Sequence, residues 1–425
     1  MPTIKERDRE IIWHPYTPMK IWPEAIAIVK GEGVYLTDED GEKYIDAISS
    51  WWVTIHGHAH PYIAQKVSEQ LATLEHCIFA GFTHEPAVRL AERLLEILPQ
   101  NMKKIFYSDN GSTAIEVAIK MALQYWDNKG TPKKKLIAIK NAYHGDTFGA
   151  MAVSGRSVFT NAFTDFLFDV SFIPFPSKGN EQTSLQALED ILQQGDVAAF
   201  IMEPLVQGSA GMYMYAPEVL EQYFQLCKKY NALIIDDEVM TGFGRTGPLF
   251  AFNHIVAQPD IVCLSKGLTG GTMPMGITAT TLDVFDAFYD DDRMKTLYHG
   301  HSFTANPAIC AAALASLDLL LQDSCTDNRK RIAAAHAAFA REIEIHPMLA
   351  EVRQTGTIIA FELKTDVPSY HNAMRDVMYR FFLEKKIIMR PLGNIIYLIP
   401  PYCITNDELG YVYSCIKELL DKISA

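Results

Sequence analysis

The feature that most constrains the fold is an alternation of short apolar runs with helical patterns between residues 105 and 265. The runs are IFYS (105–108), LIAI (136–139), VAAFIM (197–202), ALIID (232–236) and DIVCLS (260–265). Each run is bounded by polar or turn residues, which is typical of strands buried on both faces of a parallel sheet. Between the first two runs, apolar residues recur at helical spacing from Ile115 to Trp126. The alternation predicts a doubly wound α/β domain, with helices on both faces of a large, mostly parallel sheet.

The C-terminal part has a different pattern and predicts a smaller α+β domain. After about residue 310 the pattern indicates an Ala-rich helix, a strand at 358–363, a helix near 372–384, two short strands around Gly393 and a final amphipathic helix. Strands and helices of this kind, without the regular alternation, are typical of an α+β arrangement.

The N-terminal part predicts two short strands in residues 34–47, around the turn Asp40-Gly41, and then a helix at 62–74. About 50 residues precede the large sheet, so we expect these strands to join the smaller domain. The expected division is an N-terminal segment at 1–58 that packs with the small domain, a large cofactor-binding α/β domain at 59–310 and a small C-terminal α+β domain at 311–425.

Composition argues against several classes of partner. The formal charge is −13, with acidic and basic residues mixed along all 425 positions, so no basic face is available for nucleic acid or anionic lipid. No run approaches the roughly 20 apolar residues of a membrane-spanning helix, and the charged start MPTIKERDRE is unlike a signal peptide. The seven scattered cysteines contain no CxxC pair, which argues against a disulfide framework and a structural zinc. We expect a cytoplasmic protein without a metal, nucleic acid or membrane partner.

Residues that follow the apolar runs form a candidate site, because ligands of open α/β sheets bind at the carboxyl ends of the strands. Gly111 and Ser112 open the helix after the first run, where free backbone N–H groups and a hydroxyl suit a phosphate. The same pair is also a common helix cap. Tyr143 follows the second run and could stack on a planar cofactor or simply cover the core.

Asp237 and Lys266 follow the fourth and fifth runs and complete the set. A carboxylate at a strand end can keep a pyridinium nitrogen protonated, although it could also cap a turn. A lysine that ends an apolar strand is costly unless it is paired or used covalently, although it could extend to solvent. The joint order of anion-binding helix start, aromatic ring, carboxylate and lysine favours a pyridoxal-phosphate site in which Lys266 forms a Schiff base.

The sequence LIIDDEVMTGFGRTG, followed by DIVCLSKG, resembles the signature of the class III aminotransferases, which are fold-type I pyridoxal-phosphate enzymes. The resemblance covers essentially the whole chain. The segments WHPYTPM, SSWWVTIHGH, ALQYW, YHGDTFGAM and RPLGNIIYLIPPY are similar to the biotin-pathway branch of that class. This resemblance implies a ping-pong transfer of an amino group from S-adenosylmethionine to 8-amino-7-oxononanoate, which gives 7,8-diaminononanoate.

The resemblance also implies roles for individual residues. The catalytic residues would be Lys266 and Asp237. The cofactor would be bound by Gly111, Ser112, Tyr143, Asp237, Lys266, His301 and Ser302. The substrates would be bound by Tyr16, Trp51, Tyr143, Lys266, Gly300 and Arg390. Ser302 would reach the phosphate in the neighbouring subunit, which implies a homodimer with shared active sites, and Arg390 would hold a substrate carboxylate.

Several alternatives stay open. The HGHSF form at 299–303 also resembles relatives that use lysine as the amino donor. Another class III enzyme, such as an ω-amino acid or diamine transaminase or a 2,1-aminomutase, would share the fold, and a non-catalytic pyridoxal-phosphate-binding protein would keep it without activity. A nucleotide-binding oxidoreductase is not supported, because no GxGxxG follows the early strands. The sequence does not rank Asp146, Glu203 and His144 as supporting groups of the site or as structural residues.

Overall fold

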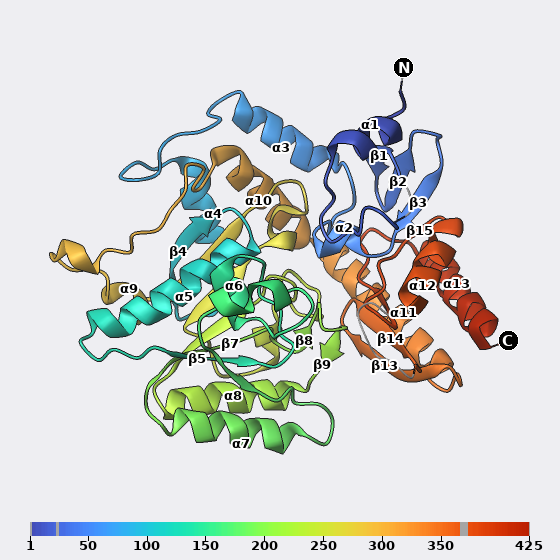
Figure 1. The fold of residues 1–425 in the computed structure, drawn as a ribbon. Coiled ribbons are helices and arrows are strands. Elements are labelled where there is room, and N and C mark those ends of the chain that lie inside the picture. The colour runs from blue at the N-terminus through green and yellow to red at the C-terminus, as the bar shows by residue number, and fades with distance from the viewer. Residues whose placement is uncertain (1, 23–24, 366–372, 425) are drawn as a thin grey trace.

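The computed structural model describes residues 2–22, 25–365 and 373–424. A seven-stranded sheet forms its centre (Figure 1). In spatial order the strands are β4 (Met102–Ser108), β12 (Gly276–Thr281), β11 (Ile261–Leu264), β10 (Leu233–Asp237), β7 (Val197–Met202), β5 (Lys135–Ile139) and β6 (Ser171–Ile173). The pairings from β11 to β6 are parallel, whereas β12 is antiparallel to both of its neighbours. The α/β prediction is confirmed, and each predicted run matches one of these strands, with at most one residue of the run beyond each end of the strand.

Helices cover both faces of the sheet, which explains why its strands are apolar on both sides. In β7, neighbouring residues point in opposite directions. Ile201 packs in a cluster with α5 (Gly111–Asn128), and Phe200 packs in another cluster with α7 (Glu181–Leu192) and α8 (Pro217–Lys229). In Figure 1, α7 and α8 lie together below the sheet. The large sheet is therefore the middle of three layers.

Two further sheets form the part of the molecule on the right of Figure 1. The first contains β1 (Ile28–Glu32), β2 (Tyr35–Asp38), β3 (Lys43–Asp46) and β15 (Ile387–Ile388); the second contains β13 (Leu349–Thr355), β14 (Ile358–Leu363) and β16 (Ile395–Leu398). Since β15 pairs with β3, the N-terminal strands share a sheet with the C-terminal part. This part also contains the helices α11 (Asp323–Ile343), α12 (Ala373–Glu384) and α13 (Asn406–Ser424).

The expected domain limits at residues 58 and 310 stay predictions. Residue 310 lies inside α10 (Pro307–Leu320), which packs against α3 (Pro61–Leu71) and α4 (Glu85–Ile97). The start predicted for the helix near residue 372 lies outside the described residues. The remaining elements are α1 (Ile4–Ile11), α2 (Ser49–Trp52), α6 (Phe148–Val153), α9 (Leu282–Asp286), β8 (Val206–Gln207), β9 (Tyr213–Met214) and the 3-10 turns Asn161–Phe166, Ala251–His254, Lys266–Thr269 and Arg293–Lys295.

In the described ranges, no single helix has both the length and the apolar composition needed to cross a membrane. The pair α10 and α11, which is bent by 69°, meets those criteria only when its two helices are taken together.

Candidate active site

A cavity of about 500 Å³ lies at the carboxyl ends of β10 and β11, where ligands of α/β sheets bind. Most of the predicted site residues line it, although they come from distant parts of the chain. These are Tyr16, Trp51, Gly111, Ser112, Tyr143, Asp237, Lys266 and Arg390. The cavity lies within the range of volumes that is usual for small-molecule sites.

Lys266 follows β11 and begins a 3-10 turn. Its φ of 46° is an uncommon value for a residue with a side chain, and such strain is found at functional sites. The ammonium group lies 4.9 Å from the centre of the Trp52 ring, and it makes no hydrogen bond or ion pair within the described residues. Burial lowers the pKa of Lys266, while the charges of Asp237 and Glu203 oppose that shift. A lowered pKa favours the neutral amine, which is the form that attacks a carbonyl carbon.

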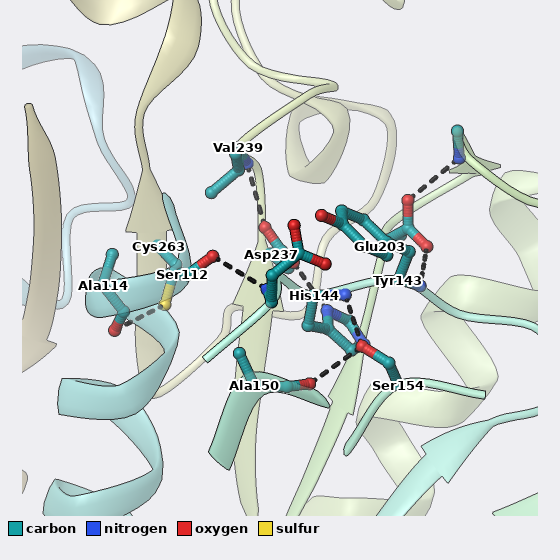
Figure 2. Close-up of polar contacts among 12 residues, drawn as sticks. Ser112, Ala114, Tyr143, His144, Ala150, Ser154, Glu203, Asp237, Val239 and Cys263 are labelled. Atoms are coloured by element: carbon teal, nitrogen blue, oxygen red, sulfur yellow. Dashed lines mark hydrogen bonds and ion pairs between the residues drawn. The ribbon is translucent and has the colours of Figure 1, made fainter. Parts of the chain in front are cut away.

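Asp237 ends β10, and its side chain is almost completely buried. Its Oδ1 accepts a hydrogen bond from the Val239 backbone N–H at 3.1 Å, and its Oδ2 lies 2.6 Å from His144 Nδ1 (Figure 2). The His144 backbone N–H donates to Ser154 Oγ at 2.9 Å, which fixes the backbone from which the imidazole extends. These contacts fix the carboxylate at the edge of the cavity. Among the residues that the structure describes, His144 Nε2 has no hydrogen-bond partner, although it is buried.

The start of α5 forms the phosphate-binding candidate. Asn110 caps this helix, because its Oδ1 accepts a hydrogen bond from the Thr113 backbone N–H at 2.9 Å. The first N–H groups of a helix lack partners within the helix, and the helix dipole favours an anion there. A Cβ at Gly111 would lie 2.8 Å from a methyl group of Val239, so only glycine allows this close approach. The hydroxyl of Ser112 adds a polar group at the same end of the cavity.

Glu203 connects two backbone segments beside the cavity. Its carboxylate accepts hydrogen bonds from the backbone N–H groups of Tyr143 and Gly208, both at 2.9 Å (Figure 2). Burial raises the pKa of Glu203 to about 7; His144 opposes this shift and Asp237 adds to it. Burial also raises the pKa of Tyr143, whose hydroxyl lies 3.1 Å from that of Tyr16. Glu203, His144 and Asp146, which the sequence does not rank, all line the cavity.

Aromatic rings and one guanidinium group form the other end of the cavity. The Arg390 guanidinium carbon lies 4.8 Å from the centre of the Trp51 ring, and its Nη2 donates to the Tyr16 carbonyl at 3.2 Å. The Tyr16 ring meets Trp51 edge-on at 5.3 Å, and the Tyr16 hydroxyl is hydrogen-bonded to the Asp146 carboxylate. An arginine presented by aromatic walls suits the recognition of a carboxylate.

Three predicted residues lie elsewhere. Gly300, His301 and Ser302 belong to the connection that leads to α10, and they are not among the residues that line this cavity. Their role at a neighbouring subunit stays a prediction.

Among the lining residues outside the set of predicted site residues are Trp52, residues 272–275 and Tyr397. The Gly270-Gly271 pair after Lys266 could have indicated residues 272–275, because paired glycines mark a tight loop. Tyr397 lies within the apolar strand β16, and nothing local in the sequence distinguishes it.

These residues fit pyridoxal phosphate. They offer a lysine whose ammonium group makes no hydrogen bond or ion pair to any described residue, a buried carboxylate for a ring nitrogen, an anion-binding helix start and an aromatic wall. Within the described ranges, no three His, Cys, Asp or Glu side chains are grouped so that they could hold a metal ion. The donor set therefore matches an organic cofactor with a phosphate.

Residues 18–420 match the family model described as aminotransferase class-III. The chain belongs to this family of pyridoxal-phosphate-dependent aminotransferases, which confirms the resemblance and the fold-type I prediction. Relatives with more specific names also match over nearly their whole length. The adenosylmethionine-8-amino-7-oxononanoate aminotransferase of Synechococcus elongatus is 47% identical over 420 residues, or 97% of this chain and 99% of the relative. The enzyme of the same name from Geobacter sulfurreducens is 39% identical, and the match covers 99% of this chain and 98% of the relative.

Solved structures agree with the sequence relatives. The adenosylmethionine-8-amino-7-oxononanoate aminotransferase of Methanocaldococcus jannaschii superposes with a TM-score of 0.93 at 35% identity, and the match covers 98% of each chain. The omega transaminase of Pseudomonas jessenii in complex with PMP has a TM-score of 0.92 at 27% identity, over 99% of this chain and 98% of that one. The fold is thus shared between transaminases with different names, and the substrate must be argued from the site.

Proposed function

We propose that this protein transfers an amino group from S-adenosylmethionine to 8-amino-7-oxononanoate and forms 7,8-diaminononanoate for biotin biosynthesis. The observation that carries the proposal is the convergence of Lys266, Asp237 and Arg390 on one cavity with aromatic walls. Relatives that carry the corresponding name, at 34 to 47% identity, support this choice of substrate.

Arg390 and the aromatic walls suit the proposed acceptor. A nine-carbon keto acid has one terminal carboxylate and an aliphatic body, so it needs one cationic partner and an otherwise apolar channel. Arg390 offers its guanidinium at the end of the cavity, and Trp51 and Tyr16 supply the walls. The reacting carbon would then lie toward Lys266.

Pyridoxal phosphate, when bound, supplies a ring that withdraws electrons from the carbon that carries the amino group. The negative charge of Asp237 keeps a proton on the ring nitrogen, and His144 holds the carboxylate in place. The Nζ of Lys266 takes a proton from the donor carbon and later delivers one to the acceptor carbon, because its lowered pKa lets it act as a base. Gly111 and Ser112 hold the phosphate.

We further propose that the protein is a cytoplasmic homodimer with shared active sites. Ile78, Phe82, Tyr298 and Phe303 are exposed by 59 to 68%, and the two segments that carry them contact each other. Large exposed apolar residues that lie together are typical of an interface. Residues 300–302 lie in the second of these segments, as expected if they act at the neighbouring site. The seven free cysteines are in keeping with a reducing compartment.

The experiment incubates the purified protein, with pyridoxal phosphate and 8-amino-7-oxononanoate, with either S-adenosylmethionine or lysine. Mass spectrometry then measures 7,8-diaminononanoate, and a Lys266→Ala variant is the control. We expect product with S-adenosylmethionine and none with the variant. If product formed with lysine and not with S-adenosylmethionine, lysine would be the amino donor. If neither donor gave product while an ω-amino acid and pyruvate reacted, the proposal would be replaced by the omega-transaminase alternative.

A further inference from the structure

Four consecutive residues with side chains adopt the left-handed helical conformation. Ser49, Ser50, Trp51 and Trp52 have φ values of 51°, 44°, 72° and 76°, and they form the single turn α2. The Trp52 backbone N–H donates to the Ile48 carbonyl at 2.9 Å, and a second bond of the same spacing follows it. L-residues visit this region singly because Cβ then crowds the next carbonyl. A run of four therefore requires surroundings that hold it in place.

The carboxylate of Asp46 supplies much of that support. Asp46 ends β3, is fully buried and does not line the cavity. Its Oδ1 accepts a hydrogen bond from the Ile48 backbone N–H at 3.2 Å, and its Oδ2 accepts one from Ser50 Oγ at 2.7 Å. The same Oδ2 lies 2.9 Å from His58 Nε2. One side chain thus connects the residue before the turn, the turn itself and a histidine beyond it.

The turn places two adjacent tryptophans against the cavity. The Trp52 ring lies 4.9 Å from the Lys266 ammonium group, and its Nε1 donates to the Tyr397 hydroxyl at 3.1 Å. The Trp51 ring contacts the guanidinium of Arg390. Neighbouring side chains on a strand would point to opposite faces, so an extended backbone could not supply both contacts. The cavity wall at both Lys266 and Arg390 therefore depends on the turn.

We propose that Asp46 is a positioning residue: it holds the left-handed turn and thereby fixes the tryptophans that form the substrate wall. It acts through Trp51 and Trp52 and does not touch the substrate itself. The inference rests on the proposed function for the choice of substrate, whereas the arrangement of the tryptophans does not depend on it. Glycine would adopt the positive φ of position 50 more easily than serine does. Serine is explained here because its hydroxyl donates a hydrogen bond to Asp46.

The test compares Asp46→Ala with Asp46→Asn and Ser50→Ala. Displacement of a positioning group by about 1 Å can cost about 100-fold in efficiency. We therefore expect Asp46→Ala to raise the KM for the keto acid by about tenfold or more, with a much smaller change in kcat. Ser50→Ala should change the KM in the same direction by less. Asp46→Asn keeps an oxygen that can accept the hydrogen bond from the Ile48 backbone N–H. Its KM for the keto acid should therefore lie closer to that of wild type than to that of Asp46→Ala.

Asp38 provides a matched control. It is also almost completely buried and accepts hydrogen bonds from the backbone N–H groups of Asp40 and Glu42 and from the Tyr44 hydroxyl, in the same sheet. Asp38→Ala should lower thermal stability to a similar extent and leave the KM unchanged. The second measurement is the near-ultraviolet circular dichroism of the cofactor-free protein, where the tryptophan bands should change for Asp46→Ala and not for Asp38→Ala.

Equal KM values and equal tryptophan bands for the Asp46 and Asp38 variants would overturn the inference. If Asp46→Ala does not fold, the KM and the tryptophan bands of Ser50→Ala test the inference in its place. If the wild-type protein does not react with the keto acid, the proposed function fails, but the tryptophan bands of the cofactor-free variants still test the role of Asp46.

Discussion

Replacement of Asp237 by Asn separates the charge of this residue from its shape. Asparagine has nearly the same shape, and its Oδ1 can still accept the hydrogen bond from the Val239 backbone N–H. Its amide can donate to His144 Nδ1 when that nitrogen carries no proton. We therefore expect the Asp237→Asn protein to fold and to bind pyridoxal phosphate, while the negative charge that holds a proton on the ring nitrogen is lost.

The structure sets the size of the effect. Asp237 is only 4% exposed, so water screens its charge poorly. Loss of one preorganised group that stabilises charge in a transition state costs roughly 3 kcal/mol. At 1.36 kcal/mol for each tenfold change, turnover should fall by about 100-fold or more. Asp237→Ala should be slower still, because it also leaves His144 without its partner.

The assay is single-turnover transamination at saturating substrate, combined with a titration of pyridoxal phosphate. Asp236→Asn is the matched control, since Asp236 is the preceding residue of β10 and is equally buried. Burial raises the pKa of Asp236 well above its usual value, which favours the neutral acid, and Asp236 does not line the cavity, so Asp236→Asn should change turnover little. Turnover of Asp237→Asn within about threefold of wild type would refute the role of the charge.

Two further predictions concern Arg390 and Glu203. Arg390→Ala should raise the KM for the keto acid and leave kcat nearly unchanged, because a binding contact is lost; a change confined to the donor's KM would contradict the assignment. Burial raises the folded-state pKa of Glu203 from 4.5 to about 7, so ionisation of Glu203 removes about 3 kcal/mol of stability as the pH rises through that window. Urea unfolding of Glu203→Gln should show a smaller loss of unfolding free energy between those pH values than wild type shows. If the two proteins lose the same unfolding free energy, the raised pKa of Glu203 is wrong.

The parallel strands of the large sheet could be predicted because burial on both faces leaves an uninterrupted apolar run, as in β7. Two strands of this large sheet, β12 and β6, could not be predicted. The sequence of β12 is GITATT, whose threonines and small residues give no apolar run, although its first five residues are buried. β6 has only three residues, too few to show a pattern. For both, tertiary pairing rather than local sequence decides the structure.

The candidate site could be predicted where chemistry follows a strand, as at Asp237 and Lys266, because topology brings strand ends together. The left-handed turn at Ser49–Trp52 could not, since its four residues all disfavour that conformation and Asp46 supports it through side-chain contacts. Similarly, the neighbours of Glu203 lie five and 60 residues away in the sequence. The role predicted for Ser302 concerns the active site of a second subunit, and it stays a prediction because Ser302 does not line the cavity of its own chain.

The most direct test of the central claim is the absorbance spectrum of the purified protein with added pyridoxal phosphate, before and after S-adenosylmethionine and, separately, lysine. Unbound pyridoxal phosphate, which is itself yellow, is removed before each spectrum, so that the remaining yellow band reports cofactor held covalently by Lys266. We predict that wild type shows this band, that S-adenosylmethionine bleaches it, and that Lys266→Ala lacks it. If lysine bleached the band and S-adenosylmethionine did not, the protein would still be an aminotransferase, but lysine would be its donor. A wild-type protein without the band, or a Lys266→Ala variant that keeps it, would contradict the account.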